Sequence, residues 1–217
     1  MTPLIIQIPL WIAATNAYVV APAADGPAVI VDAPPDPERL FDVLREQSLV
    51  PVALLVTHGH IDHVGGAGTI DAGLALKTYL HPDDDWLASD PAAQLLGLLG
   101  TVDDVDKYTP PTSMVPLAHG DRLELAGMAL DVIHTPGHTP GHCCFHLLDE
   151  GLLFSGDQLF AGSVGRTDLP GGSWDQLIAS MRDRVMTLDD ATQVLPGHGP
   201  TTTLARERAT NPFLQDL

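Results

Sequence analysis

Short apolar runs separated by turns dominate the first third of the chain. Leu4–Ile8, Ala17–Ala21 and Ala28–Asp32 are each too short for a typical helix, and Pro and Gly lie between them, as is usual for strands joined by turns. Val52–Val56 is uniformly apolar, which favours a strand buried on both faces. Leu76–Leu80 is a further strand candidate.

Two segments in this part of the chain follow a helical pattern instead. In Asp36–Gln47 the apolar residues recur on one face, Asp36 is a candidate N-cap and Pro37 suits the first helical position. Val64–Ala72 is expected to begin a second helix. The alternation of strands with helices indicates a sheet covered by helices on its outer face.

The second half returns to strands and ends in helices. Strands are expected at Arg122–Leu125, Ala129–Ile133, His142–Leu147, Leu152–Ser155 and Gln193–Leu195, and helices at Trp174–Leu188 and Thr203–Thr210. Two similar halves of this kind predict an α+β fold, an αββα sandwich of two mixed β-sheets with helices on the outer faces. At 217 residues the chain fits a single domain spanning 1–217.

The segment 83–112 departs from this regularity. It combines three consecutive aspartates, a Leu- and Gly-rich stretch and the pair Pro110-Pro111. We expect a helical or irregular excursion from the sheet. It is either a surface flap with an apolar underside or a lid over a substrate.

Composition narrows the possible partners. The formal net charge is −18, from 10 Lys+Arg against 28 Asp+Glu, which argues against binding of nucleic acid or of an anionic membrane surface. No apolar stretch reaches the ~20 residues of a membrane-spanning helix. The first 20 residues lack Lys and Arg, unlike a signal peptide.

The two cysteines, Cys143 and Cys144, are adjacent in an apolar run. Neighbours in a strand point to opposite faces, and a disulfide between them would be strained. We expect two buried free thiols rather than a nucleophile, and a reducing, cytoplasmic location.

The densest chemical signal is the segment Thr57–His63. It places His58, His60, Asp62 and His63 directly after the apolar run Val52–Val56. Imidazoles and carboxylates are ligands of Zn, Fe, Ni or Mn. Two histidines two residues apart can point to one side of an extended turn, while Asp62 and His63 can serve a neighbouring ion.

Three later loops each present one further ligand-type side chain beside a glycine. They are His138 in Thr135–Gly141, Asp157 after Leu152–Phe154, and His198 in Pro196–Pro200. Each signal is weak alone, because turns often pair Gly with a polar residue. Together with the first cluster they give seven ligands, which is what two adjacent ions require if one carboxylate bridges them.

The remaining polar candidates carry less weight. His134 and His142 flank the His138 loop and could orient a ligand from behind, whereas His81, His119 and His146 are expected to be ordinary surface or core histidines. Arg166, in Gly165–Asp168, is either paired with Asp168 or an anchor for a substrate carboxylate.

The motif His58-x-His60-x-Asp62-His63, followed by His138, Asp157 and His198, resembles the metallo-β-lactamase fold superfamily over nearly the whole chain. Within it, Thr135–Gly141, Ser155–Phe160 and Gly162–Gly172 resemble the glyoxalase II-type enzymes, the hydroxyacylglutathione hydrolases. The true β-lactamases usually lack the aspartate at the position of Asp157.

This resemblance implies a binuclear site and a reaction. His58, His60 and His138 would hold one ion, Asp62, His63 and His198 a second, and Asp157 would bridge them. The cofactors would be two divalent ions, Zn²⁺ first and Fe or Mn as alternatives. A hydroxide shared by the ions would attack a thioester such as S-lactoylglutathione, with Asp62 and Asp157 as catalytic carboxylates and Arg166 as a substrate-binding residue.

Several alternatives stay open at this stage. One is an iron-dependent persulfide dioxygenase of the same superfamily, another is a lactonase or other ester hydrolase, and a third is a non-catalytic metal-binding domain. The larger glyoxalase II enzymes have a helical C-terminal extension that helps to bind glutathione, and this chain stops soon after His198. The thiol carrier is therefore also open.

Overall fold

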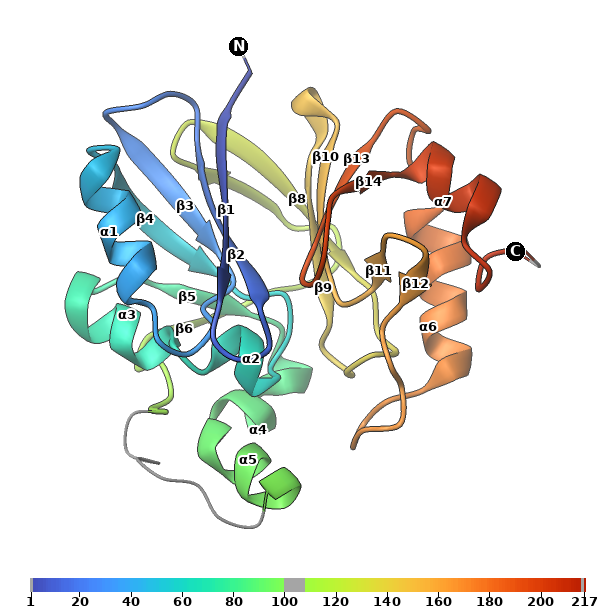
Figure 1. Cartoon of the computed structure of the whole chain (residues 1–217), viewed down its shortest axis with the longest axis horizontal. Coiled ribbons are helices and arrows are strands. Elements are labelled where there is room, and N and C mark those ends of the chain that lie inside the picture. Colours follow the sequence, from blue (N-terminus) through green and yellow to red (C-terminus); the bar gives the residue numbers. More distant parts are fainter. Residues whose placement is uncertain (1, 100–107, 216) are drawn as a thin grey trace.

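Two six-stranded sheets face each other in the computed structural model, which describes residues 2–99, 108–215 and 217 (Figure 1). The first sheet has the strand order β1 (Leu4–Leu10), β2 (Thr15–Ala21), β3 (Pro27–Val31), β4 (Val50–Leu55), β5 (Thr78–Leu80) and β6 (Met114–Pro116). Its first three strands are antiparallel neighbours, and β3 to β6 run parallel.

The second sheet is also mixed. Its order is β14 (Thr202–Thr203), β13 (Gln193–Pro196), β10 (Leu152–Gly156), β9 (Cys143–Leu147), β8 (Met128–His134) and β7 (Arg122–Leu125). Only the β10–β13 pair is parallel among its described strands. A small hairpin, β11 (Leu159–Phe160) with β12 (Ser163–Val164), follows β10.

Helices cover the outer face of each sheet (Figure 1). They are α1 (Glu38–Glu46) and α3 (Ala67–Leu74) on the first sheet, and α6 (Trp174–Ser180), its π-helical continuation Met181–Val185 and α7 (Leu204–Thr210) on the second. Three further helices, α2 (Ile61–Val64), α4 (Asp85–Ala88) and α5 (Pro91–Leu99), lie together at one end of the first sheet.

The alternation of side chains along the buried strands explains the four layers. In β2, Ala17 and Val19 pack toward α1 and α3, whereas Tyr18 and Val20 pack between the sheets. Successive strand residues point to opposite faces, so a strand that is apolar throughout needs a cover on both sides. The predicted αββα sandwich is confirmed.

The cysteine pair follows the same rule. Cys143 packs between the sheets and Cys144 packs toward α6, and both thiols are free and buried. Burial raises the pKa of each thiol, for Cys144 to about 12. The expectation of two inert core cysteines is confirmed.

Differences from the predicted elements are local. Helix α1 begins at Glu38 with Pro37 as its N-cap, so Asp36 lies outside it with a left-handed φ of 60°. In the segment 83–112 the structure has the helices Asp85–Ala88 and Pro91–Leu99, residues 108–112 are in neither helix nor strand, and residues 100–107 of the predicted excursion lie outside the described residues. Strands β6, β11, β12 and β14 were not predicted, since two or three residues show no periodicity.

None of the helices in the described part of the chain is long and apolar enough to cross a membrane.

The start of β2 joins the two sheets by hydrogen bonds. The Tyr18 hydroxyl donates to the Pro196 carbonyl at the end of β13 over 2.7 Å. The Asn16 amide donates to the same carbonyl over 2.9 Å and to the Gly199 carbonyl over 3.0 Å. These bonds fix the loop that carries His198 against the first sheet.

Replacing Tyr18 with Phe removes one of these bonds. Because Asn16 still donates to the Pro196 carbonyl, no acceptor is orphaned, and the free energy of unfolding should fall by about 1 kcal/mol in urea denaturation. Tyr79→Phe is the matched control, since that ring packs against the same inter-sheet core. Equal stability of the Tyr18→Phe and wild-type proteins would contradict the role of this bond.

Candidate metal centre

The seven predicted ligand side chains converge at one edge of the sandwich. They follow the ends of β4 in the first sheet and of β8, β10 and β13 in the second. The helix expected over Val64–Ala72 is α3 at Ala67–Leu74. Helix α2, which starts immediately after His60 and holds Asp62 and His63, was not predicted. This helical turn separates the direction of Asp62 and His63 from that of His58 and His60.

Three imidazoles form a tripod. Nε2 of His58, Nδ1 of His60 and Nε2 of His138 lie 3.1, 2.9 and 3.1 Å from one another. The three rings are nearly perpendicular in pairs, at 85°, 81° and 83°. Nitrogens that bind one ion at about 2.0–2.1 Å are separated by roughly this distance.

In two of these rings, a hydrogen bond to the nitrogen that faces away from the centre of the tripod fixes the tautomer. Nδ1 of His138 donates to the Arg166 carbonyl over 2.7 Å, which leaves its Nε2 with a lone pair. The Thr57 hydroxyl donates its single proton to Asp32, so it accepts from Nδ1 of His58. Lone pairs of His58 and His138 therefore face each other.

Protonation of the imidazoles does not remove these facing lone pairs. Burial, together with the neighbouring imidazoles, holds the pKa of His58 well below its usual value and lowers that of His60 to about 3. His58 and His60 are therefore neutral at physiological pH, and no carboxylate belongs to the tripod. A neutral cage of converging nitrogen lone pairs fits a divalent cation.

The second cluster is acidic. Nε2 of His198 and of His63 lie 3.1 and 3.5 Å from Oδ2 of Asp62. Nδ1 of His63 donates to Asp32 over 2.8 Å, so Nε2 carries the lone pair whenever His63 is neutral. Burial would lower the pKa of His63, but the carboxylates of Asp157, Asp62 and Asp32 raise it well above normal. The cluster therefore favours a positive charge, which is a proton on His63 or a bound cation.

Asp157 lies between the two clusters. Its Oδ1 is 3.2 Å from Nε2 of His63, and its Oδ2 is 3.6 Å from Nε2 of both His138 and His198. Both Oδ1 of Asp157 and Nε2 of His63 are buried without a hydrogen-bond partner. Although burial opposes ionisation, the surrounding imidazoles lower the pKa of Asp157. When His63 is neutral, its Nε2 and Oδ1 of Asp157 are two buried acceptors that face each other, which fits a shared cation.

Two glycines allow this approach. Gly156 has a φ of 47°, and a Cβ there would lie 2.7 Å from His142 and Thr57. A Cβ at Gly197 would lie 2.4 Å from Oδ1 of Asp157 and 2.6 Å from the His63 ring. Any larger residue at Gly197 would therefore fill the space between these two ligands.

Asp84 holds two of the ligand loops together, and sequence reasoning missed it. The carboxylate is buried, and it accepts from the Gly59 amide, the Gly141 amide and the Thr139 hydroxyl at 2.9, 2.7 and 2.6 Å. Burial raises its pKa. In the sequence, Asp84 belongs to a run of three aspartates, and no local pattern distinguishes it from its neighbours.

His142 and His134 orient the ligand loops, which is the role left open for them. Nδ1 of His142 donates to the Thr135 hydroxyl, and its Nε2 accepts from the Asp157 amide over 3.0 Å. Nε2 of His134 donates to the Pro140 carbonyl over 2.8 Å. Thr15, which was also missed, donates to Asp62 over 3.0 Å.

His81, Asp83 and His134 form another group of potential ligands. The His81 and His134 rings are stacked, with centroids 4.0 Å apart and an angle of 7° between planes. In-plane lone pairs of parallel rings cannot converge on one ion. We assign these residues to packing behind the His138 loop.

Arg166 contributes its backbone to the site through its bond from His138. Its guanidinium is exposed and makes two bonds of 2.7 Å with Asp168, which matches the ion-pair interpretation. A role of this side chain in binding substrate stays a prediction.

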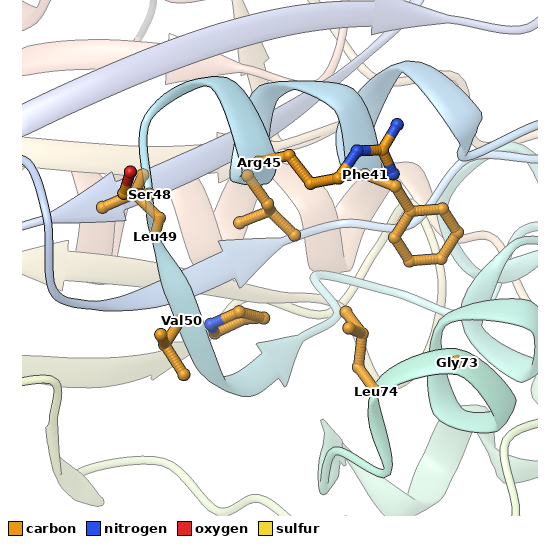
Figure 2. Close-up of a pocket in the computed structure, with 9 residues that line it drawn as sticks. Phe41, Arg45, Ser48, Leu49, Val50, Gly73 and Leu74 are labelled. Carbon is orange, nitrogen blue, oxygen red and sulfur yellow. The ribbon is translucent and has the colours of Figure 1, made fainter.

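A large hollow on the surface lies elsewhere. It has a volume of about 580 Å³ and is lined by Phe41, Leu49 and Leu74, among others, between α1 and α3 (Figure 2). None of the predicted ligands lines it. The polar clusters, rather than this apolar groove, therefore define the candidate site.

The model of one family, the metallo-beta-lactamase superfamily, matches residues 11–198. The chain belongs to that superfamily. A hydroxyacylglutathione hydrolase of Haemophilus influenzae is 34% identical over 187 residues, which cover 86% of this chain and 87% of the relative. Superfamily membership and the two clusters together support an enzyme of the metallo-hydrolase type that binds divalent metal ions.

Two solved structures of superfamily members are similar over their full lengths. The BLEG-1 B3 metallo-beta-lactamase shares 37% identity with a TM-score of 0.87, and the alignment covers 97% of this chain and 99% of that one. A protein solved in a di-iron-bound form shares 40% identity with a TM-score of 0.85, covering 96% and 100%.

Asp84→Asn should destabilise the site of this superfamily member. An amide presents only one oxygen to the three donors, so a backbone N–H or the Thr139 hydroxyl loses its acceptor. We expect the free energy of unfolding to fall by roughly 1–3 kcal/mol. The exposed neighbour substitution Asp85→Asn should change it by less than about 0.5 kcal/mol. Equal effects of the two substitutions would disprove the role of Asp84 in holding the two ligand loops together.

Asp32→Asn should reduce metal content. The new amide can place an N–H opposite Nδ1 of His63, which favours the tautomer whose proton is on Nε2 and removes that lone pair. Elemental analysis should show a fall from about two ions per chain to about one. Asp25→Asn is the control, because Asp25 is exposed with a φ of 58°, which Asn tolerates. Unchanged metal content in Asp32→Asn would overturn this assignment.

Proposed function

We propose that this protein is a metal-dependent thioester hydrolase of the glyoxalase II type, with S-lactoylglutathione as the first substrate to test. The observation that carries the proposal is the position of Asp157. Its buried carboxylate reaches both the neutral tripod and the acidic cluster. The similarity to a hydroxyacylglutathione hydrolase supports the same reaction class.

The two clusters differ in charge, and this difference suits their proposed roles. Two bound divalent ions would supply a water of lowered pKa and would polarise the thioester carbonyl. The neutral tripod of His58, His60 and His138 would leave the charge of its ion least compensated, which suits the carbonyl oxygen. The leaving thiolate would lie nearer the other side, which is formed by Asp62, His63 and His198.

Asp62 and Asp157 are proposed as the catalytic carboxylates. The Asp62 side chain is 22% exposed, and Thr15 donates to its Oδ2. It can therefore take a proton transiently and release it to solvent. Asp157 is more deeply buried, and the His142 ring holds its backbone amide, so we assign it to holding both ions at a fixed spacing.

A second candidate activity is β-lactam ring opening, which the similarity to a B3 metallo-beta-lactamase favours. The di-iron-bound relative keeps iron among the candidate metals, and with it the persulfide dioxygenase reaction. The carboxylate between the clusters is the reason to prefer a thioester over a β-lactam, since the true β-lactamases that the site resembles usually lack it.

The deciding experiment combines elemental analysis with three assays of the purified holoenzyme. About two metal ions per chain and rapid hydrolysis of S-lactoylglutathione are expected. Hydrolysis of nitrocefin should be slower by orders of magnitude, and glutathione persulfide should cause no oxygen uptake. One iron per chain with persulfide-dependent oxygen uptake would replace the hydrolase proposal.

Asp157→Ala should lower kcat/KM for the thioester by more than about a hundredfold and should reduce bound metal. His58→Ala should have a similar effect, because the tripod loses one nitrogen. The control is Asp149→Ala, a carboxylate exposed on the turn Leu148–Glu150 far from the clusters along the sheet. Full turnover and full metal content in either site variant would refute the proposal.

A further inference from the structure

A cavity of about 450 Å³ adjoins the tripod. His60 forms part of its wall, and the other lining residues are Trp86, Asp90, Ala93, Gln94, Leu169 and Pro170. They come from the helices α4 and α5, the turn between them, and the loop that follows Arg166. A volume of this size is typical of a binding site for a small organic group.

We propose that this cavity binds the acyl group of the substrate and selects uncharged, apolar acyl chains, with Trp86 as the principal contact. The inference rests on the proposed thioester hydrolysis and deepens it by naming the substrate class.

The side chains of Gln94 and Asp90 in the wall are already engaged in hydrogen bonds. The Gln94 amide donates to the carbonyls of Gly59 and Leu87, and its oxygen accepts from the Ile61 amide over 3.0 Å. The Asp90 carboxylate accepts from the Ala93 amide over 3.1 Å. The wall therefore offers the ligand chiefly apolar surface.

The charge of the wall excludes an anion. Among the described residues that line the cavity there is no Lys or Arg, and Asp90 places a negative charge there. The guanidinium of Arg166, a few residues before Leu169, is already paired with Asp168 through two bonds. A carboxylate on the bound group would be desolvated without a counter-charge, which costs free energy.

Trp86 gives the cavity a large exposed apolar face. The residue is 50% exposed, and the loop that carries Leu169 and Pro170 approaches it closely. A Cβ added at Gly171, where φ is 86°, would lie 3.5 Å from Cζ2 of Trp86 and 2.8 Å from Pro140. An indole in this position can pack against an aliphatic chain without needing a polar partner.

The position of the cavity assigns it to the acyl side of the thioester. It is lined by His60 of the tripod and by none of Asp62, His63 or His198. Under the proposed roles the carbonyl oxygen lies on the tripod side and the thiolate leaves on the other. The substituent of the carbonyl carbon then extends toward Trp86.

The test varies only the acyl group, on the uncharged carrier N-acetylcysteamine. For the holoenzyme, kcat/KM should rise about tenfold or more from the acetyl to the pentanoyl thioester, because each buried methylene contributes to binding. The glutaryl thioester, which has the same chain length with a terminal carboxylate, should be at least about tenfold poorer than the pentanoyl one. A glutaryl substrate equal to the pentanoyl one would overturn the proposal.

Trp86→Ala isolates the role of the indole. It should abolish most of the pentanoyl preference through KM, so that the pentanoyl-to-acetyl ratio of kcat/KM falls toward one. Trp174→Ala is the matched control, since Trp174 is 45% exposed and contacts Phe213 rather than the cavity. An unchanged pentanoyl-to-acetyl ratio in Trp86→Ala would contradict the proposal.

A binding measurement separates this inference from the proposed reaction. Pentanamide, which cannot be hydrolysed as a thioester, should quench tryptophan fluorescence of the holoenzyme at lower concentration than acetamide, and this difference should vanish in Trp86→Ala. If no thioester is hydrolysed but this difference persists, the reaction is wrong and the apolar subsite stands. If thioesters are hydrolysed but pentanamide and acetamide quench the fluorescence equally, the apolar subsite is wrong.

Discussion

The site depends on buried lone pairs that are forced to point at one another. Nitrogens of His58, His60 and His138 lie within 3.1 Å, and an oxygen of Asp157 faces a nitrogen of His63. Lone pairs that face each other repel when no cation lies between them, so other contacts must hold them. Hydrogen bonds to the ring nitrogens of His58, His63 and His138 that face away from the site do this. Asp32 illustrates the design by accepting from both Thr57 and His63.

The sandwich supplies the rigidity that this repulsion demands. The ligand loops come from both sheets, and the start of β2 ties them together at the line where the sheets meet. Asn16 and Tyr18 hold the end of β13, while the Gly197 amide donates to the Gly156 carbonyl over 2.8 Å. The loops of Asp157 and His198 are thereby fixed to each other and to the first sheet, so ligands distant in sequence keep a constant spacing.

The ligands could be read from the sequence, but their supports could not. His58, His60, Asp62 and His63 stand out because a dense group of imidazoles after an apolar strand is rare by chance. Likewise, the alternation of apolar strands with helices in two similar halves predicts the four layers. Asp32 and Asp84 belong to 28 acidic residues, and only their donors, which come from distant segments, distinguish them. Short strands such as β14 depend on their partners and leave no periodic signal.

The asymmetry of the two clusters gives the site a direction. One side is a tripod of imidazoles, of which burial keeps His58 and His60 uncharged, and the other gathers carboxylates around His63. A largely apolar cavity opens beside the tripod, through His60. Under the proposed reaction, a bound substrate would meet chiefly apolar surface at one end and a polar environment at the other. This polarity would orient a thioester before any bond changes, because exchanging its two ends would place an apolar chain among carboxylates and a polar carrier against Trp86.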